Sequence, residues 1–355
     1  MTDLLDLTAQ LVDIRSESHH EQEITDWIES CLRSRAPWLS LHRLGNNLVA
    51  RTELGRPMRL VLAGHTDTVP INDNVPSRRE GEVLWGCGTA DMKSGLAVML
   101  ELACSVQEPA VDVTYVFYEA EEVAAEHNGL KKLFEERPDL LVGDVALLGE
   151  PTNGDIEAGC QGVARVWITL SGARAHTARP WMGRNAIHRL GGLLDRVNAW
   201  PGREPLVDGC RYRESLQVVR VEGGIAGNVV PDRARVLVAY RFAPDRCADE
   251  ALQWLTDLFA SVLEADDEIT VDDRSESAQP GLSHPLLAAL VERNGLEVRA
   301  KLGWTDVARF AEHGIPATNF GPGDATLAHT KDERVERSSV ERTYRALHEL
   351  LISGV

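Results

Sequence analysis

The sequence has no long hydrophobic run, no basic leader and no paired-cysteine motif. No apolar stretch approaches the roughly 20 residues that a membrane-spanning helix requires. The N-terminal segment MTDLLDLTAQLVDIRSES lacks the basic and then apolar layout of a secretory signal, and its apolar residues have the spacing of an amphipathic helix. We therefore expect a cytoplasmic protein without a membrane partner.

The cysteines and the basic residues exclude two further classes of protein. The six cysteines are scattered without a CxxC pair, which argues against a zinc finger and provides no disulfide framework. Lys and Arg number 37 against 55 Asp and Glu, so the formal net charge is −18. Because nucleic acids are bound mainly through an excess of basic side chains, we expect no nucleic-acid partner. A small anionic substrate would need a local group of arginines.

The length and the hydrophobic patterns predict two domains. The chain has 355 residues, which is more than one ordinary core accommodates. Short apolar runs alternate with helical patterns up to about residue 163, as in an α/β layer with a largely parallel sheet. We expect an α/β domain formed by residues 1–163 and 277–355, interrupted by an inserted α+β domain at 164–276. The polar segment 272–285 has the composition of a linker, and the two linkers should lie side by side.

Side chains that can bind divalent metals lie mainly at the ends of the predicted strands. They are His65, Asp67, Asp91, Glu121, Glu122, Glu150 and His329. Ligands of open α/β sheets bind at the carboxyl ends of the strands, so we expect these positions to converge on one crevice. Histidines and carboxylates without thiolates suit Zn²⁺ or a similar ion in a catalytic site. Such a set can hold two ions about 3.5–4 Å apart that share one carboxylate.

Each of these residues also has an ordinary interpretation. His65 could be a buried core histidine, Glu121 and Glu122 a solvated acidic turn, and Asp91 a helix N-cap. The metal site is favoured because all the candidates share one end of the same predicted sheet. Asp67 lies two residues after His65 on the same face, so its carboxylate can orient the imidazole ring.

Seven segments have a recognisable character: LAGHTDTVP, GCGTADMKSGLAVML, EAEE, LLGEPT, GARAHTARPWMGRNAIH, GNVVPD and AHTKDE. Together they resemble the M20 family of metallopeptidases and deacylases, in the family's order and over nearly the whole chain. The resemblance implies a two-domain fold, in which an α/β zinc-binding catalytic domain carries an inserted α+β domain for dimerisation and closure as a lid. Cys87 is a departure, since many relatives have an arginine in a GRG sequence at this place.

The resemblance also implies the roles of the metal-site residues. It implies two Zn²⁺ per subunit, with Co²⁺ or Mn²⁺ as possible substitutes, and a cis peptide between Asp91 and Met92. Glu121 would be the general base and Asp67 would orient His65. His176 would come from the partner subunit of a homodimer and stabilise the oxyanion. The implied ligands are His65 and Glu150 for one ion, Glu122 and His329 for the other, and Asp91 as the bridge.

Within the family, HTARPWMGRNAIHRL, GNVVPDRARVLVAYRFAPD and LGWTDVARF are most similar to actinobacterial deacylases that act on N-succinyl-LL-2,6-diaminopimelate, in lysine and diaminopimelate biosynthesis. That substrate carries several carboxylates, which guanidinium groups bind well. The expected substrate-binding residues are the cations Arg179, Arg184 and Arg241, the neutral donors Asn228 and Thr305, and Asp306 for a substrate ammonium. Alternatives are a deacylase acting on N-acetylornithine, a dipeptidase or carboxypeptidase, and a non-catalytic, metal-stabilised binding protein.

Overall fold

The computed structural model describes residues 3–355, and the chain forms two compact units. The first comprises Met1–Gly159, Pro280–Arg299 and Arg309–Val355, and the second comprises Cys160–Gln279 and Ala300–Ala308. The segment Ala300–Ala308 thus groups with the second unit, whereas the sequence analysis assigned all of 277–355 to the first domain. Residues 1–2 of the expected catalytic domain lie outside the described residues.

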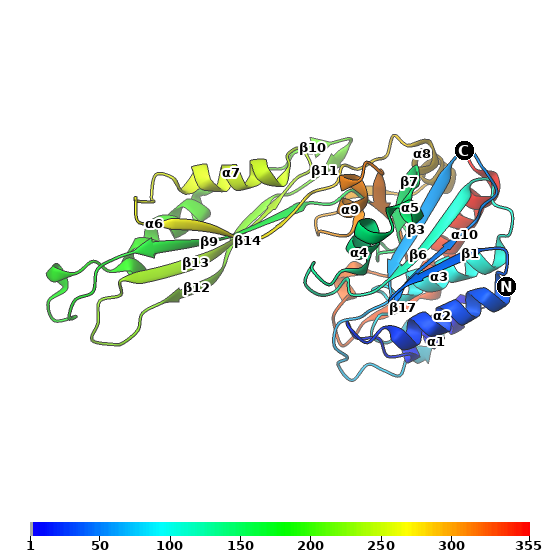
Figure 1. The fold of residues 1–355 in the computed structure, drawn as a ribbon, viewed down its shortest axis with the longest axis horizontal. Helices are drawn as coiled ribbons and strands as arrows, with labels where there is room; N and C mark the ends of the chain where they lie inside the picture. Colours follow the sequence, from blue (N-terminus) through cyan, green and yellow to red (C-terminus); the bar gives the residue numbers. More distant parts are fainter. Residues whose placement is uncertain (1–2) are drawn as a thin grey trace. The chain divides into compact units, whose positions relative to one another are not determined.

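The first unit is built around an eight-stranded mixed sheet (Figure 1). In spatial order its strands are β1 (Ser40–Leu44), β2 (Asn47–Arg51), β6 (Asp112–Tyr118), β3 (Arg59–His65), β7 (Val145–Leu148), β16 (Ala317–Asn319), β8 (Ile156–Ala158) and β15 (Val298–Ala300). The central strands β6, β3, β7 and β16 are parallel, whereas β1, β2 and β8 run antiparallel to their neighbours. The expectation of a largely parallel sheet therefore holds only at the centre. Two residues join β1 to β2, and so short a connection permits only antiparallel pairing.

Helices surround the central strands of this sheet. They are α1 (Leu4–Asp13), α2 (Gln22–Arg35), α3 (Lys93–Ser105), α4 (Gly129–Glu136), α5 (Pro138–Leu141), α8 (Pro285–Asn294), α9 (Val307–Glu312, which begins in the second unit), the 3-10 turn η2 (Ala325–Leu327) and α10 (Arg337–Ser353). Helix α3 contacts β3, β6 and the helices α1, α2 and α10. Every residue of β6 is buried, as expected for a parallel strand covered on both faces. No helix within residues 3–355 is both long and apolar enough to cross a membrane.

A small antiparallel sheet joins two segments that are far apart in the sequence. Its strands are β17 (Arg334–Glu336), β5 (Val83–Trp85) and β4 (Arg78–Glu80). Strand β5 ends just before the loop that contains Asp91, and β17 begins five residues after His329. Because Arg334 pairs with Trp85, the loop that bears Asp91 and the segment that bears His329 lie next to each other.

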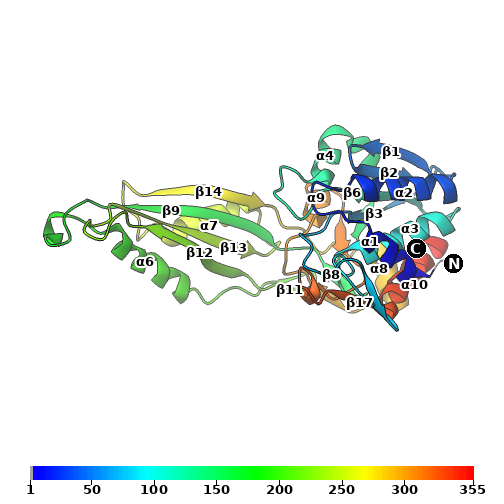
Figure 2. The same cartoon turned by 90° about the horizontal axis from the view of Figure 1, so that it is seen from below.

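The second unit is a four-stranded antiparallel sheet with two helices on one face (Figure 2). Its elements are β9 (Gly162–Ser171), η1 (Pro180–Met182), α6 (Ala186–Ala199), the hairpin β10 (Leu206–Val207) and β11 (Cys210–Arg211), β12 (Ser215–Gly223), β13 (Arg233–Phe242), α7 (Ala248–Phe259) and β14 (Glu268–Ser275). The sheet order is β12, β13, β9, β14. Helices α6 and α7 contact each other and the sheet, and enclose a core that includes Leu193, Val236 and Leu255.

The chain enters and leaves the four-stranded sheet through neighbouring segments. Cys160 and Ala278 form an antiparallel bridge with two N–H···O bonds of 3.1 Å. The predicted linker at 272–285 begins too early, because residues 272–275 belong to β14. Their polar side chains suggested a loop, but Asp273 accepts a 2.8 Å hydrogen bond from Arg165 of the neighbouring strand.

Candidate metal centre

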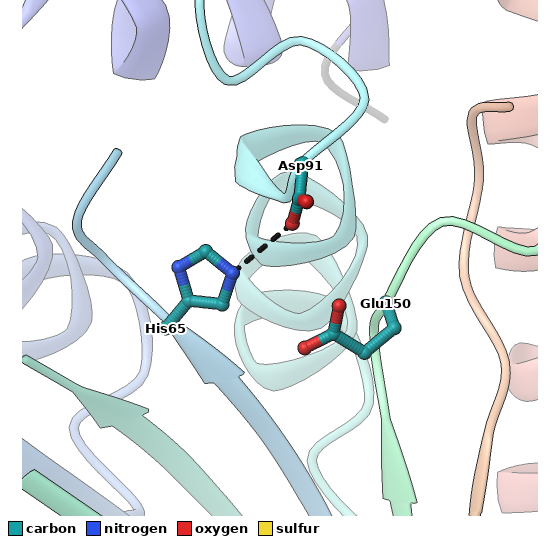
Figure 3. Close-up of side chains that lie close together, drawn as sticks. All are labelled: His65, Asp91 and Glu150. Atoms are coloured by element: carbon teal, nitrogen blue, oxygen red, sulfur yellow. Dashed lines mark hydrogen bonds and ion pairs between the residues drawn. The ribbon is translucent and has the colours of Figure 1, made fainter. Parts of the chain in front are cut away.

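Four of the predicted metal-binding side chains come from the carboxyl ends of parallel strands. His65 is the last residue of β3, Glu121 and Glu122 follow β6, and Glu150 follows β7. Parallel strands end at the same edge of a sheet, so these side chains meet there. Asp91 lies in the loop before α3, and Figure 3 shows its carboxylate pointing at the ring of His65, with Glu150 directed into the same space.

Asp91 lies between two histidines. Its Oδ1 is 3.1 Å from Nε2 of His65, and its Oδ2 is 3.5 Å from Nε2 of His329. Nε2 of His329 also lies 2.8 Å from Oε1 of Glu122. Each oxygen of the Asp91 carboxylate therefore faces a different imidazole ring, which is the arrangement that a bridging metal ligand requires.

The ligand atoms form two sets that overlap at Asp91. One set contains His65, Asp91 and Glu150, and the other contains Asp91, Glu122 and His329; within each set the ligand atoms lie within 4.8 Å of one another. Nitrogen and oxygen donors without thiolates suit Zn²⁺ or a similar divalent ion. The residues present therefore fit two metal ions that share one carboxylate.

Glu121 lies close enough to this centre to be a ligand itself. A third set of ligand atoms, again within 4.8 Å of one another, contains His65, Glu121 and Glu122. The distances alone thus do not distinguish a metal ligand from a general base at Glu121. The role of Glu121 as the base stays a prediction from the family resemblance.

Asp67 is a buried carboxylate that contacts two parts of the centre. Nδ1 of His65 lies 3.0 Å from the main-chain oxygen of Asp67 and 3.4 Å from its carboxylate Oδ1. The backbone N–H groups of Glu121 and Glu122 donate to the same carboxylate at 3.0 and 3.1 Å. The residue expected to orient His65 therefore also holds the turn after β6.

The charges within the cluster change the protonation of its histidines. Although burial disfavours the charged ring, the carboxylates of Asp67 and Asp91 raise the pKa of His65 well above its usual value. Hydrogen bonds to Asp91 and Glu122 raise the pKa of His329 to about 10. Burial would raise the pKa of Asp91, but the two histidines hold it below its usual value. These carboxylates therefore favour the protonated form of both rings, and metal binding must displace such protons.

The other predicted site residues belong to the second unit, and three of them are exposed on loops. The three exposed residues are His176, Arg179 and Asn228. The main chain of His176 forms a bridge with Val229, so the two loops run side by side. Nδ1 of the His176 ring accepts a 3.0 Å hydrogen bond from the backbone N–H of Ala178.

The remaining four predicted residues have different surroundings. The guanidinium of Arg184 forms a two-pronged ion pair with Glu264 at the surface. Arg241 is half-buried in β13, where burial and the charge of Arg165 lower its pKa. Thr305 and Asp306 are buried. The roles of all seven residues in the second unit stay predictions.

Two residues that the sequence analysis did not select also contact the centre. The hydroxyl of Ser18 donates to the carboxylate of Asp67 at 2.7 Å, across 49 positions of the sequence. Glu333 accepts a 3.0 Å hydrogen bond from the backbone N–H of Asp91, across 242 positions. No local pattern marks either residue, because both act over long sequence separations. For Glu333, the one available signal is its place four residues after His329 in AHTKDE.

Comparisons with known proteins identify the family of the chain and its relatives. The model of Peptidase family M20/M25/M40 matches residues 61–353. A Mycobacterium tuberculosis protein, provisionally named succinyl-diaminopimelate desuccinylase DapE, is 54% identical over 333 residues, which are 94% of this chain and 93% of that protein. Succinyl-diaminopimelate desuccinylase of Corynebacterium glutamicum is 47% identical over 334 residues, which are 92% of this chain and 90% of that protein. A tripeptidase structure from Staphylococcus aureus covers 98% of this chain and 97% of its own, with a TM-score of 0.79 and 22% identity, and so shares the fold.

Proposed function

Because the chain belongs to peptidase family M20/M25/M40, we propose that it is a metal-dependent amide hydrolase with N-succinyl-LL-2,6-diaminopimelate as its substrate. The products are succinate and LL-2,6-diaminopimelate, an intermediate of lysine biosynthesis. The observation that carries the choice of substrate is the high identity, over nearly the full length, to the two actinobacterial proteins named as succinyl-diaminopimelate desuccinylases. The cytoplasm is the location expected for such a biosynthetic enzyme.

The donor set supports two Zn²⁺ per subunit, with Co²⁺ or Mn²⁺ as possible substitutes. His65 and Glu150 would hold one ion, Glu122 and His329 the other, and Asp91 both. Bound ions of this kind polarise an amide carbonyl and lower the pKa of an attacking water. The placement of Asp91 between the two histidines is the geometric observation that supports a shared ligand.

Glu121 carries out the proton transfers in this proposal. Its carboxylate takes a proton from the water that attacks the amide carbonyl, and then gives the proton to the departing amine. Its backbone N–H donates to Asp67 at 3.0 Å, which limits how far the turn after β6 can move. Asp67 thereby positions the base and the ring of His65 together.

The second unit supplies the oxyanion donor and the substrate-binding groups. His176 of the partner subunit in a homodimer would donate a hydrogen bond to the negative charge that develops on the carbonyl oxygen. The exposed position of His176 supports a role outside its own unit. The substrate carboxylates would be bound by Arg179, Arg184 and Arg241, with Asn228 and Thr305 as neutral donors and Asp306 for the ammonium group.

A comparison of substrates tests this function. The metal-free protein is reloaded with Zn²⁺, its metal content is measured, and its turnover is compared on N-succinyl-LL-2,6-diaminopimelate, N-acetylornithine and a dipeptide. We expect two ions per chain and a clear preference for the succinylated substrate. Cleavage of N-acetylornithine or the dipeptide with no action on the succinylated compound would show that the substrate is wrong. A metal-loaded protein that cleaves none of the three would be a binding protein.

A further inference from the structure

Glu333 is a buried carboxylate without a role in the proposed reaction. Glu333 is 2% exposed and follows His329 by four positions in the sequence. Three backbone N–H groups donate to it: that of Gly88 to Oε2 at 3.1 Å, and those of Ala90 and Asp91 to Oε1 at 2.9 and 3.0 Å. A buried charge is costly unless hydrogen bonds compensate it, and these donors do so only in part, because burial still raises the pKa of Glu333 to about 7.

The same residue also ties the two chain segments together through its main chain. The carbonyl oxygen of Glu333 accepts a 3.0 Å hydrogen bond from the N–H of Gly86. The next residue, Arg334, begins β17 and pairs with Trp85 at the end of β5. The loop from Gly86 to Asp91 is therefore attached to Glu333 at four of its six residues.

This attachment links two of the candidate metal ligands. Asp91 and His329 face each other across 3.5 Å, but they come from opposite parts of the chain. The side chain of Glu333 accepts a hydrogen bond from the backbone N–H of Asp91. Glu333 is also four residues after His329 in the sequence. Other hydrogen bonds also hold this loop, such as that from the N–H of Cys87 to the carbonyl oxygen of Asn74, but the N–H of Asp91 itself donates to Glu333.

We propose that Glu333 is a positioning residue, which sets the Asp91 carboxylate between His65 and His329 and so makes both metal sites tight. This inference rests on the proposed metal-dependent function. Among the described residues, Glu333 is in none of the three sets of candidate metal ligands, and its carboxylate is bonded to the backbone of the loop. Its removal should therefore weaken metal binding before it changes the chemistry of a loaded centre.

Asp112 provides a matched control for a merely structural brace. It is 3% exposed and belongs to the same unit. Its carboxylate accepts the backbone N–H groups of Leu54 and Arg56 at 2.9 and 2.8 Å, and the hydroxyl of Thr52 at 2.6 Å. Asp112 begins β6, whereas Glu121 and Glu122 follow the opposite end of that strand. It is thus also a buried carboxylate bonded to a backbone segment, but one that lies 3.7 Å from the guanidinium of Arg59 and away from the metal centre.

The test compares E333Q with D112N in the full-length protein. In E333Q an NH₂ group replaces one of the two carboxylate oxygens. This group is a donor that faces a backbone N–H, which is also a donor, so the loop should be displaced. We expect the Zn²⁺ affinity of the metal-free protein, measured by competition with a chelator, to fall roughly 10–100-fold. The absorption spectrum of the Co²⁺-loaded protein should also change. D112N should lower the melting temperature of the metal-free protein while leaving the affinity and the spectrum as in the parent.

Different outcomes separate this inference from the proposed function. If E333Q binds Zn²⁺ within about threefold of the parent and gives the parental Co²⁺ spectrum, Glu333 is only a structural brace and the inference is wrong. The same conclusion follows if D112N weakens metal binding as much as E333Q does. If E333Q does not fold, the same measurement is made on E333D. This variant keeps a carboxylate, but its side chain is one methylene shorter, so the oxygens lie farther from the backbone of the loop. A parent protein that binds no metal, or binds metal without hydrolysing amides, would instead contradict the proposed function.

Discussion

Several candidate site residues of the first unit are buried, whereas several of those in the second unit are exposed. In the first unit, His65 and Asp67 are buried, and the carboxylates and rings around them are joined by hydrogen bonds. In the second unit, His176 and Arg179 are exposed, and Arg184 is paired with a neighbouring glutamate at the surface. The metal centre is thus organised within its own unit, whereas the groups expected to bind substrate are organised only in part.

The sheets of the two units also differ in how far their residues are buried. All residues of β6 are buried, but buried and less buried residues alternate along β13. On β12 and β14 of the second unit, Val219, Val221 and Val271 are each more than half exposed, at 56, 55 and 54%. Exposed apolar positions on a sheet mark surfaces that a partner can cover. This difference agrees with the proposed homodimer, in which His176 acts in the partner subunit.

The largest effect is expected at Glu121, in the organised unit. Replacing Glu121 with Gln removes the base but retains the backbone N–H that donates to Asp67. Turnover should fall by about 10²–10⁴, because a positioned general base contributes on that order. The metal content, measured by elemental analysis, should stay at the parental value. In the control Glu122→Gln, a proposed ligand is lost, so metal content should fall. Parental turnover in the Glu121 variant would show that another group is the base.

A smaller loss is expected at His176, in the exposed unit. Replacing His176 with Ala should lower kcat by roughly 10²–10³, as the loss of one oxyanion donor does. Metal content should not change. If the donor comes from the partner subunit, mixing this variant with the Glu121→Gln variant restores part of the activity. Each dimer with one chain of each variant then contains one intact site, in which one chain supplies Glu121 and the other supplies His176. A mixture that is no more active than its components would contradict donation between subunits.

The smallest effect is expected at Arg184, which already has a partner. Arg179 makes no ion pair with any residue in the described part of the chain, whereas Arg184 pairs with Glu264. Replacing Arg179 with Gln should raise KM about 10–100-fold, since a hydrogen bond to a charged group contributes about 1.5–3 kcal/mol. For Arg184→Gln we expect less than about a fivefold change, because exposed ion pairs contribute only about 0–1 kcal/mol. Steady-state kinetics on the succinylated substrate measures both, and a reversed order would make Arg184, not Arg179, the main carboxylate-binding group of the two.

Much of the fold around the metal centre could be predicted from local patterns. The metal-binding candidates were expected at the ends of strands, and His65 is the last residue of the strand Arg59–His65. The family resemblance implied a cis peptide between Asp91 and Met92, and the structure confirms it. Apolar runs identify buried strands because a strand covered on both faces needs hydrophobic residues at every position.

The errors occurred where pairing depends on distant residues. The antiparallel pairs of β2 with β6 and of β8 with β16 were not expected in a largely parallel sheet. Residues 272–275 have the composition of a loop, yet they pair with β9, and Asp273 is bonded to Arg165. Polarity alone does not separate a loop from an exposed strand, because the partner across the sheet decides which one forms.

The sequence by itself determined which side chains could bind metal and that several of them follow strands, because both properties depend on residue type and on short-range pattern. Only the tertiary structure decided that the two oxygens of Asp91 face His65 and His329. It also brought Ser18 to Asp67 and Glu333 to the backbone of Asp91. Contacts of this kind join residues tens to hundreds of positions apart, and no local pattern records them, because they exist only once the strands have paired.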